Sequence, residues 1–302
     1  MALIELTFLG TSAMVPTKER NVQAVFLKYD TEGILFDCGE GTQRQMNIAG
    51  INRFSITRIF ISHWHGDHIA GLVGLIQTLG KRAEQVRLQL HGPKGTKLHM
   101  EHLLKCSVFD QRIDLTIFEH TPRKATPIFE SEDFCILAAP MHHTIPTLGY
   151  AFVQKDRWRV MMDAVRKLGI PEGPHLQQLQ KGKSITYQGK KIEVDAVTER
   201  MQGKKIVIIP DTAPCASALE LAQDADILVS ESTYTSEHAE KAEEHCHMTA
   251  AQAGMLANQA NAQKLILTHF SQRYKSVHAF EEEAKTYFPN VVCAYDFMHL
   301  NL

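Results

Sequence analysis

Three histidines and one aspartate lie within six positions at the end of an apolar run, in the stretch HWHGDH over residues 63–68. His63 and His65 are two positions apart, so in extended chain after a strand both side chains can point the same way. Asp67 and His68 fall where the next helix is expected to begin, and there both can turn back toward the strand end. Imidazole and carboxylate groups at this density are typical ligands of Zn²⁺, or of Mn²⁺ where more oxygen ligands join. Because clustering such groups for stability alone would be costly, the motif predicts a metal site.

Further candidate ligands close other apolar runs of the chain. His142 and His143 follow FCILAAPM, Asp211 follows KKIVIIP, and His269 follows KLILT. Open sheets gather their sites at the carboxyl ends of strands, so these side chains are expected to meet the HWHGDH motif. Spacing alone does not choose between His142 and His143.

The candidate ligands suffice for two metal ions. A consistent partition gives one zinc to His63, His65 and His143, a second zinc to Asp67, His68 and His269, and a bridging position to Asp211. Two zinc ions about 3.5–4 Å apart can hold a hydroxide between them and stabilise both oxygens of an in-line displacement at phosphorus. Asp67 lies next to the position of that water, and we expect it to be the general base.

The elements that must position these residues alternate along the chain in two similar halves. In the first half, periodicity and punctuation predict strands at 4–10, 23–29, 33–39, 56–62, 87–92 and 115–120, and helices at 42–50, 68–83 and 94–104. In the second half they predict strands at 134–143, 148–153, 204–212, 226–233, 264–270 and 290–296, and helices at 218–225, 248–260 and 277–288.

Residues 155–203 interrupt this alternation with a polar, basic stretch broken by Gly-Pro. From residue 155 to residue 205 there are twelve lysines and arginines against six acidic residues, a charge of about +6. The whole chain carries −2, so charge is segregated onto this segment. The segment is therefore interpreted as an insertion whose cations can contact phosphates.

Composition narrows the class of protein. The six cysteines include no CxxC pair, which indicates reduced thiols in a cytoplasm. The start MALIELTFLG lacks the basic residues and cleavage site of a secretory signal, and no apolar run approaches eighteen residues. We expect a cytoplasmic protein with no membrane partner.

Several motifs, in the same order along the chain, resemble those of the tRNase Z family within the metallo-β-lactamase superfamily. They are PTKERN, FDCGEGTQRQM, HHTIPTLGYAF, PDTAP, SEST, HMT and LTHFSQRY. The resemblance covers nearly the whole chain and selects His143 as the ligand. It implies an α/β fold, the four-layer αβ/βα metallo-β-lactamase sandwich, as one domain over 1–302 with an inserted, flexible, basic exosite arm over 155–203.

The same resemblance implies the activity and its partners. The expected enzyme is a zinc-dependent endoribonuclease, with two Zn²⁺ per subunit or Mn²⁺ in their place. It would remove the 3′ trailer from precursor tRNA, leaving a 3′-hydroxyl on the tRNA and a 5′-phosphate on the trailer. Short members of the family pair as homodimers, and no DNA partner is expected.

The resemblance also assigns roles to residues outside the ligand set. It makes His247 the proton donor, and Glu231 is placed to hold His247 in one tautomer. The residues alone equally allow His247 to be structural, since Thr249 beside it can cap a helix.

Substrate contacts are implied at two places. Lys18, Arg20 and Asn21 of PTKERN would shape the site around the cleavage point. Gly173 and Pro174 of LGIPEGP resemble the Gly-Pro motif of the arm, although KDRWRVMMD lacks the glycine-containing stretch common at its front.

Two other functions remain as alternatives. One is another phosphodiesterase or an acyl hydrolase of the same fold, which would have no use for a basic arm. The other is a non-catalytic RNA-binding protein, which the complete ligand set with Asp67 and His247 disfavours. The sequence leaves open which metal is loaded, how precursors with a CCA end are handled, and whether the arm acts across a dimer.

Overall fold

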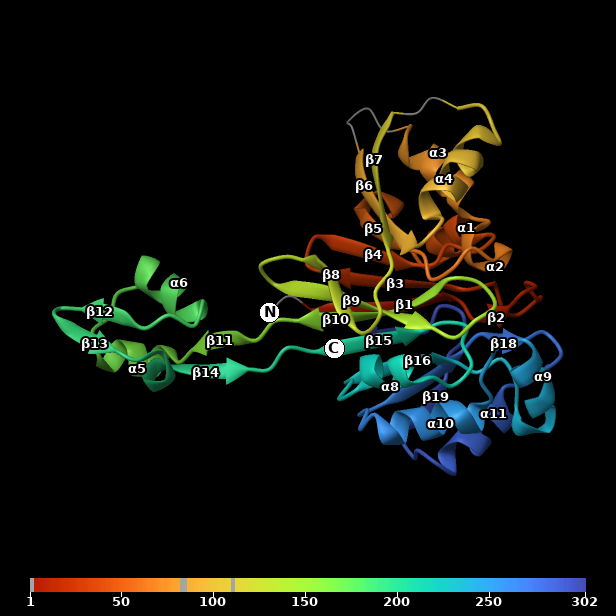
Figure 1. The fold of residues 1–302 in the computed structure, drawn as a ribbon. Helices are drawn as coiled ribbons and strands as arrows, with labels where there is room; N and C mark the ends of the chain where they lie inside the picture. The colour runs from red at the N-terminus through yellow and green to blue at the C-terminus, as the bar shows by residue number, and fades with distance from the viewer. Residues whose placement is uncertain (1–2, 82–85, 110–111) are drawn as a thin grey trace.

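The computed structural model describes residues 3–81, 86–109 and 112–302, and in these residues two seven-stranded sheets pack face to face (Figure 1). The first sheet has the order β20-β1-β3-β4-β5-β6-β7 and the second β19-β17-β16-β15-β10-β9-β8. The first contains β1 (Ile4–Gly10), β3 (Ala24–Tyr29), β4 (Glu32–Phe36), β5 (Ile56–Phe60), β6 (Val86–Pro93), β7 (Ile113–His120) and β20 (His299–Asn301). The second contains β8 (Thr126–Glu130), β9 (Phe134–Met141), β10 (Thr147–Gln154), β15 (Lys205–Ile209), β16 (Ile227–Glu231), β17 (Leu265–Thr268) and β19 (Val291–Cys293).

Alternation along single strands explains why the sheets are covered on both sides. In β15, Ile206 and Ile208 point into the core between the two sheets, whereas Val207 and Ile209 face the helices. A strand buried on both faces needs an unbroken apolar run, and this is why KIVII carries no polar residue after its lysine. The resulting four layers, helix–sheet–sheet–helix, confirm the predicted sandwich.

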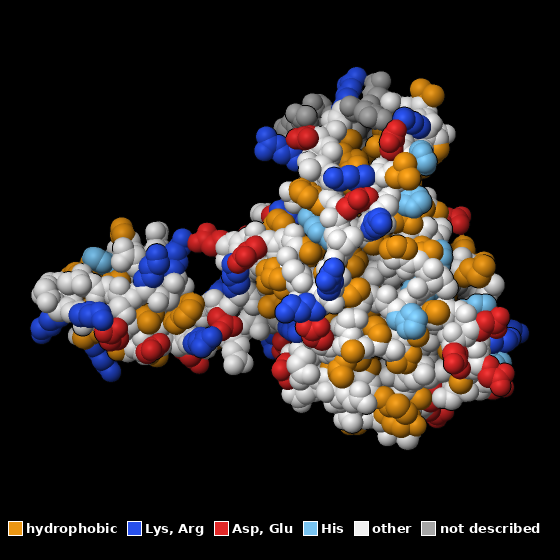
Figure 2. Space-filling view, in the orientation of Figure 1, with side chains coloured by type: hydrophobic (Ala, Val, Ile, Leu, Met, Phe, Trp, Pro, Cys, Tyr) orange, Lys and Arg blue, Asp and Glu red, His pale blue; other side chains and the backbone are white. Residues whose placement is uncertain are grey.

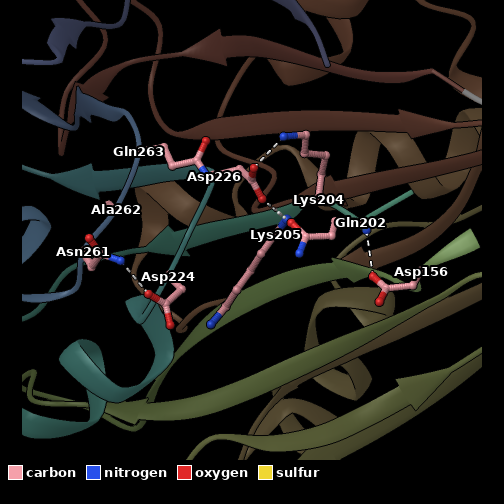
Figure 3. Close-up of a pocket in the computed structure, with 10 residues that line it drawn as sticks. Asp156, Gln202, Lys204, Lys205, Asp224, Asp226, Asn261, Ala262 and Gln263 are labelled. Carbon is pink, nitrogen blue, oxygen red and sulfur yellow. Dashed lines mark hydrogen bonds and ion pairs between the residues drawn. The ribbon is translucent and has the colours of Figure 1, made fainter. Parts of the chain in front are cut away.

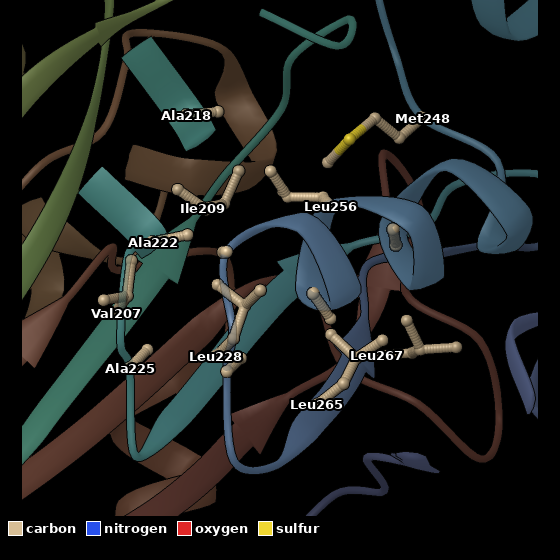
Figure 4. Packing of buried hydrophobic residues seen from close by; sticks show 14 of the residues in the cluster. Val207, Ile209, Ala218, Ala222, Ala225, Leu228, Met248, Leu256, Leu265 and Leu267 are labelled. Carbon is tan, nitrogen blue, oxygen red and sulfur yellow. The ribbon is translucent and has the colours of Figure 1, made fainter. Parts of the chain in front are cut away.

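Short helices form the two outer layers. The first sheet is covered by α1 (Thr42–Ile48), α3 (Leu72–Leu79) and α4 (Thr96–Lys105), and the second by α8 (Ala216–Ala222), α10 (Ala250–Gln259) and α11 (His278–Lys285). Figure 4 shows Leu256 of α10 and Ala222 of α8 packed over Leu228 and Leu267 of the second sheet. The longest of these helices has ten residues, and within the described chain none is long and apolar enough to cross a membrane.

The helix expected at 68–83 is wrong as one continuous element. The structure has α2 (Gly66–Ile69), a break, and then α3, while residues 82–83 of the prediction lie outside the described residues. The break occurs at Gly71, where a Cβ atom would come within 2.2 Å of the Gly39 carbonyl oxygen. Apolar spacing within one segment carries no information about this contact with a distant segment. The break allows the metal-site motif to turn independently of α3.

The basic segment projects away from the two sheets (Figure 1). Its stalk is the antiparallel pair β11 (Arg157–Val160) and β14 (Thr198–Met201). Its tip contains α5 (Met162–Lys167), α6 (Pro174–Gln180), β12 (Ile185–Tyr187), β13 (Lys190–Ile192) and α7 (Val194–Val197). A small apolar cluster of its own holds the tip together, formed by Val165, Ile170, Leu179, Ile185 and Val197.

Candidate metal centre

The predicted ligands come from the ends of several strands and meet in one place. His63 and His65 follow β5, Asp67 and His68 belong to α2, His143 follows β9, Asp211 follows β15, and His269 follows β17. Their potential ligand atoms form groups in which all atoms lie within 4.8 Å of one another: His63, His65, His143 and Asp211; Asp67, His68 and His269; and Asp211, His247 and His269. The first two groups have the composition of the predicted partition.

Asp211 lies between the two groups of ligands. Its Oδ1 is 3.5 Å from Nε2 of His68 and 3.3 Å from Nε2 of His269. Its Oδ2 is 3.7 Å from Nε2 of His63 and 3.9 Å from Nε2 of His143. One carboxylate therefore faces both sets of imidazoles, which is the arrangement that a bridging ligand requires.

Three buried atoms of this cluster have no hydrogen-bond partner among the described residues: Nε2 of His68, Nε2 of His269 and Oδ1 of Asp211. Unpaired buried polar atoms are costly, and native structures contain few of them. Here Oδ1 of Asp211 lies 3.5 Å from Nε2 of His68 and 3.3 Å from Nε2 of His269, a grouping that can enclose a cation. The donor set of imidazoles and carboxylates therefore fits a divalent metal ion.

A second ring of contacts fixes the orientation of the ligands, and the sequence did not single out its members. His68 Nδ1 is 2.8 Å from Oδ2 of Asp37, a residue of FDCGEG. His269 Nδ1 is 3.0 Å from the Thr233 hydroxyl, and His143 Nδ1 is 3.1 Å from the Cys246 carbonyl. These contacts leave the Nε2 atoms of the imidazoles directed at the cluster, as in metal-ligating histidines generally.

The carboxylates and imidazoles of this cluster lie close enough to shift one another's pKa values. Burial lowers the pKa of His68, but Asp211, Asp37 and Asp67 outweigh burial and raise it well above the ordinary value. Burial raises the pKa of Asp211, yet His269, His68 and His247 together hold it well below its usual range. The site is thus built to keep its carboxylates ionised, which is the state in which they bind metal.

His247 and Glu231 form a pair at the edge of the cluster. His247 Nδ1 is 2.9 Å from Oε1 of Glu231 and 4.0 Å from Oδ2 of Asp211. Burial lowers the pKa of His247, but the two carboxylates outweigh burial and raise it to about 9. Glu231 is itself fully buried and also accepts hydrogen bonds from the backbone of Thr212 and Thr233. The two carboxylates therefore favour the protonated imidazole, and Glu231 holds it in one orientation.

Several of the candidate metal ligands line a cleft of about 1010 Å³, here called the metal-site cleft. Its lining includes His65, Asp67, His143, Asp211, His247 and His269, together with Met14, Tyr234, His245 and Arg273, among others. Tyr234 and His245 on its wall were not predicted as site residues. His247 and Asp67 therefore both border the space that a substrate can enter.

The residues predicted to bind substrate lie in two places, the PTKERN loop beside the cleft and the arm far from it. Lys18 is exposed, Arg20 donates to the Tyr274 carbonyl at 2.7 Å, and the Asn21 side chain donates to the Glu40 carbonyl at 2.7 Å. These bonds tie the PTKERN loop to the body beside the cleft. Gly173 and Pro174 begin α6 in the arm and are not part of the metal site.

A separate cavity of about 440 Å³ lies at the root of the arm, between the amino ends of β15 and β17 (Figure 3). Lys204 pairs with Asp226 at 2.7 Å, and Asn261 donates to Asp224 at 2.8 Å. Lys204, Asp226 and Asp224 thus have partners within its own wall, whereas Lys205 bonds to the Gln223 carbonyl and Asp156 pairs with Arg200 outside it. Since it opens at the strand ends opposite the ligands, it is distinct from the metal centre.

The fold and the candidate metal ligands together define a protein of the metallo-β-lactamase class. A family model described as beta-lactamase superfamily domain matches residues 180–270, and the model for the anti-Pycsar protein Apyc1 matches residues 4–167. A metallo-beta-lactamase fold protein of Bacillus subtilis superposes with a TM-score of 0.71 at 17% identity, covering 99% of this chain and all of that one.

Sequence relatives narrow this class. The chain is 39% identical to ribonuclease Z of Methanothermobacter thermautotrophicus, covering 98% of this chain and 96% of that relative. It is 37% identical to ribonuclease Z of Chlamydia abortus over the same shares. The short form of human tRNase Z superposes with a TM-score of 0.73 at 28% identity and 98% coverage of both chains. The chain belongs to the ribonuclease Z family and is a metal-dependent endoribonuclease.

Proposed function

We propose that this chain is a zinc-dependent endonuclease that removes the 3′ trailer from precursor tRNA. The carrying observation is that all predicted ligands converge and that His247, paired with Glu231, lines the same cleft as Asp67 and Asp211. Membership of the ribonuclease Z family and the similarity to human tRNase Z supply the substrate class. The products are a tRNA with a 3′-hydroxyl and a trailer with a 5′-phosphate.

Two zinc ions would be held by the two ligand groups with Asp211 shared between them. His63, His65 and His143 would serve one ion, and Asp67, His68 and His269 the other. When bound, the ions lower the pKa of water and neutralise charge at phosphorus. Mn²⁺ is an alternative occupant, since imidazoles predominate among the donors but carboxylate oxygens are present in both groups.

The chain's own residues would move the protons. Asp67, whose pKa lies below its usual range because His68 and His269 outweigh its burial, accepts the proton of the attacking water. His247, held by Glu231 at 2.9 Å, donates a proton to the leaving 3′-oxygen. An alkoxide is a poor leaving group, so this donation matters more for RNA than for an activated ester.

The arm, residues 155–203, would bind the tRNA body away from the cut. Figure 2 shows Lys and Arg side chains along it. Several are engaged with carboxylates, such as Arg200 with Asp156 and Lys181 with Glu132. Four others make no ion pair within the described residues: Arg166, Lys167, Lys183 and Lys190. Exposed pairs are weak, so both sets remain available to phosphates. Gly173 and Pro174 would shape the tip that meets the RNA.

The remaining parts of the proposal concern assembly and compartment. The sandwich would form one domain over 1–302 with the arm as its insertion, and two copies would pair as a homodimer. Lys18, Arg20 and Asn21 would border the cleavage point, because their loop is tied beside the cleft. The free cysteines are consistent with a cytoplasmic protein, and neither a membrane nor a DNA partner is part of the proposal.

The decisive experiment incubates the purified protein with a precursor tRNA and maps the cut and its end groups. A single cut at the 3′ end of the tRNA, with a 3′-hydroxyl and a 5′-phosphate, supports the proposal. Hydrolysis of small phosphodiesters or thioesters without cleavage of precursor tRNA would instead favour another hydrolase of the fold. Binding of precursor tRNA without any hydrolysis would favour the non-catalytic alternative.

A further inference from the structure

Met14 combines an unfavourable backbone with an exposed apolar side chain. Its φ is 61°, in the left-handed region that residues with a large side chain rarely adopt. The residue is 78% exposed, so burial gives little in return. Strained positions that stabilise nothing tend to occur where a protein meets its ligand.

The backbone of Met14 is held from several sides beside the metal ligands. Its N–H donates to Oδ2 of Asp67 at 2.7 Å. The preceding strand β2 (Ser12–Ala13) pairs with β18 (Phe270–Ser271), which directly follows His269. The Ser12 hydroxyl donates to the Val15 carbonyl at 2.8 Å and closes the turn. These contacts account for the left-handed backbone.

They do not account for the side chain. Glycine would adopt the same φ without strain and would offer the same N–H to Asp67. Met14 instead lines the metal-site cleft together with Asp67 and His247, and its backbone is bonded to Asp67. Its position relative to the metal ligands is fixed by a direct hydrogen bond.

We propose that the Met14 side chain contacts the nucleobase of a nucleotide adjoining the scissile phosphate, which rests on the proposed function that the substrate is RNA. The phosphate must reach Asp67 for reaction, so a neighbouring base must pass the residue bonded to Asp67. An unbranched, polarizable thioether fits the face of any base, because it can adapt its three side-chain torsions. Met14 is then a substrate-binding residue that helps to orient the RNA beside the scissile phosphate, with little preference for the identity of the base.

A double-mutant cycle between protein and RNA tests this contact. Precursor tRNAs would carry one abasic nucleotide immediately 5′ or immediately 3′ of the mapped cut, and each would be cleaved by wild type and by Met14→Ala. We expect Met14→Ala to lower kcat/KM on intact RNA by about fivefold, the size of one thioether–aromatic contact. At one of the two abasic positions wild type should lose the same factor and the variant should lose nothing further.

Companion variants separate this contact from a structural effect. Met14→Leu keeps the apolar bulk and should retain most activity, whereas Met14→Gly removes both the bulk and the strain. Met14→Gly should therefore melt no lower than Met14→Ala but show the same loss on RNA. Leu98→Ala, at another exposed apolar side chain on α4, is the matched control and should show no coupling to either abasic site.

The outcomes distinguish this inference from the proposed function. If wild type cleaves the precursor but the loss in Met14→Ala is equal on intact and both abasic RNAs, Met14 makes no base contact and only this inference fails. If Met14→Leu is as impaired as Met14→Ala, apolar contact is likewise excluded. If wild type cleaves no RNA, the proposed function and the base contact fail together.

Discussion

Nδ1 of His247 lies 2.9 Å from Oε1 of Glu231, and the carboxylate is completely buried. Glu231 is the last residue of β16, while His247 precedes the capped start of α10. A carboxylate on one ring nitrogen fixes the tautomer and holds the proton on the imidazole. No hydrogen bond to the other ring nitrogen is found within the described residues, and His247 lines the metal-site cleft, where a leaving group would need a proton.

This pairing predicts that His247 variants depend on the leaving group. His247→Ala should lower kcat on precursor tRNA by about 10²–10⁴-fold, the usual contribution of a general acid. Its loss on bis(p-nitrophenyl) phosphate should be far smaller, because a nitrophenolate leaves without a proton. Both rates would be measured on metal-loaded enzyme, with metal content determined in parallel.

Glu231→Gln provides the positioning test for the same pair. It keeps the side-chain size and a hydrogen bond to His247 but removes the charge, so the loss on RNA should follow the same pattern at smaller size. If each variant instead lost the same factor in kcat on RNA and on the nitrophenyl ester, His247 would act through the metal ligands and not as proton donor.

The ligands could be foreseen because their signals are local. Asp211 and His269 are polar residues that close apolar strands, and parallel neighbours in a sheet end at the same edge. The choice of His143 over His142 was different, because both follow the same strand. It depended on resemblance, and in the structure His142 is exposed while His143 faces the cluster.

The features that the sequence did not predict depend on contacts between segments that are far apart in the chain. The break at Gly71 exists because Gly39 approaches it, and no periodicity within 68–83 records that approach. The Cys246 carbonyl that holds His143 is a backbone group, so its role depends on local chain direction and not on residue type. The strand β20 is short and polar, and it forms only because β1 offers it an edge.

A third prediction tests metal dependence and, with it, which of the two adjacent histidines, His142 or His143, is the ligand. His143→Ala should lose bound metal and lower RNA cleavage by at least about a hundredfold, since it removes a ligand. His142→Ala, one residue away and exposed, is the matched control and should retain both. Elemental analysis and cleavage assays of the two variants check this.

Chelation should act on stability as well as on activity. A metal that binds only the folded chain stabilises it by about 3–4 kcal/mol at a hundred to a thousand times its Kd. Treatment with a chelator should therefore lower Tm and abolish cleavage, and added Zn²⁺ or Mn²⁺ should restore both. Full activity in metal-free protein would contradict the candidate centre.

Asp296, which is not one of the candidate metal ligands, should make the free energy of unfolding depend on pH. Burial raises its pKa to about 6, against the hydrogen bonds from Thr11 and Asn21 that favour the charged form. A carboxyl whose pKa is raised on folding stabilises the fold below its ordinary pKa, and this contribution is lost as pH rises through about 6.

Asp296→Asn tests that sign, because an amide does not titrate. The free energy of unfolding of wild type minus that of the variant should fall by about 2 kcal/mol between pH 4 and pH 7. Urea titrations of both proteins under the same metal-free conditions would measure it, and groups common to both cancel. A difference that is constant or rises with pH would show that Asp296 is ionised throughout.

The arm should contribute to RNA binding through charge alone. Lys183→Ala combined with Lys190→Ala removes two cations that make no ion pair in the described structure. We expect KM for precursor tRNA to rise with little change in kcat, and the slope of log affinity against log salt to fall by about one for each phosphate interaction that is removed. Lys94→Ala with Lys97→Ala, two exposed lysines around the start of α4, is the charge-matched control. If the two double variants weaken binding equally, the effect is one of net charge, and the arm has no privileged contact with the RNA.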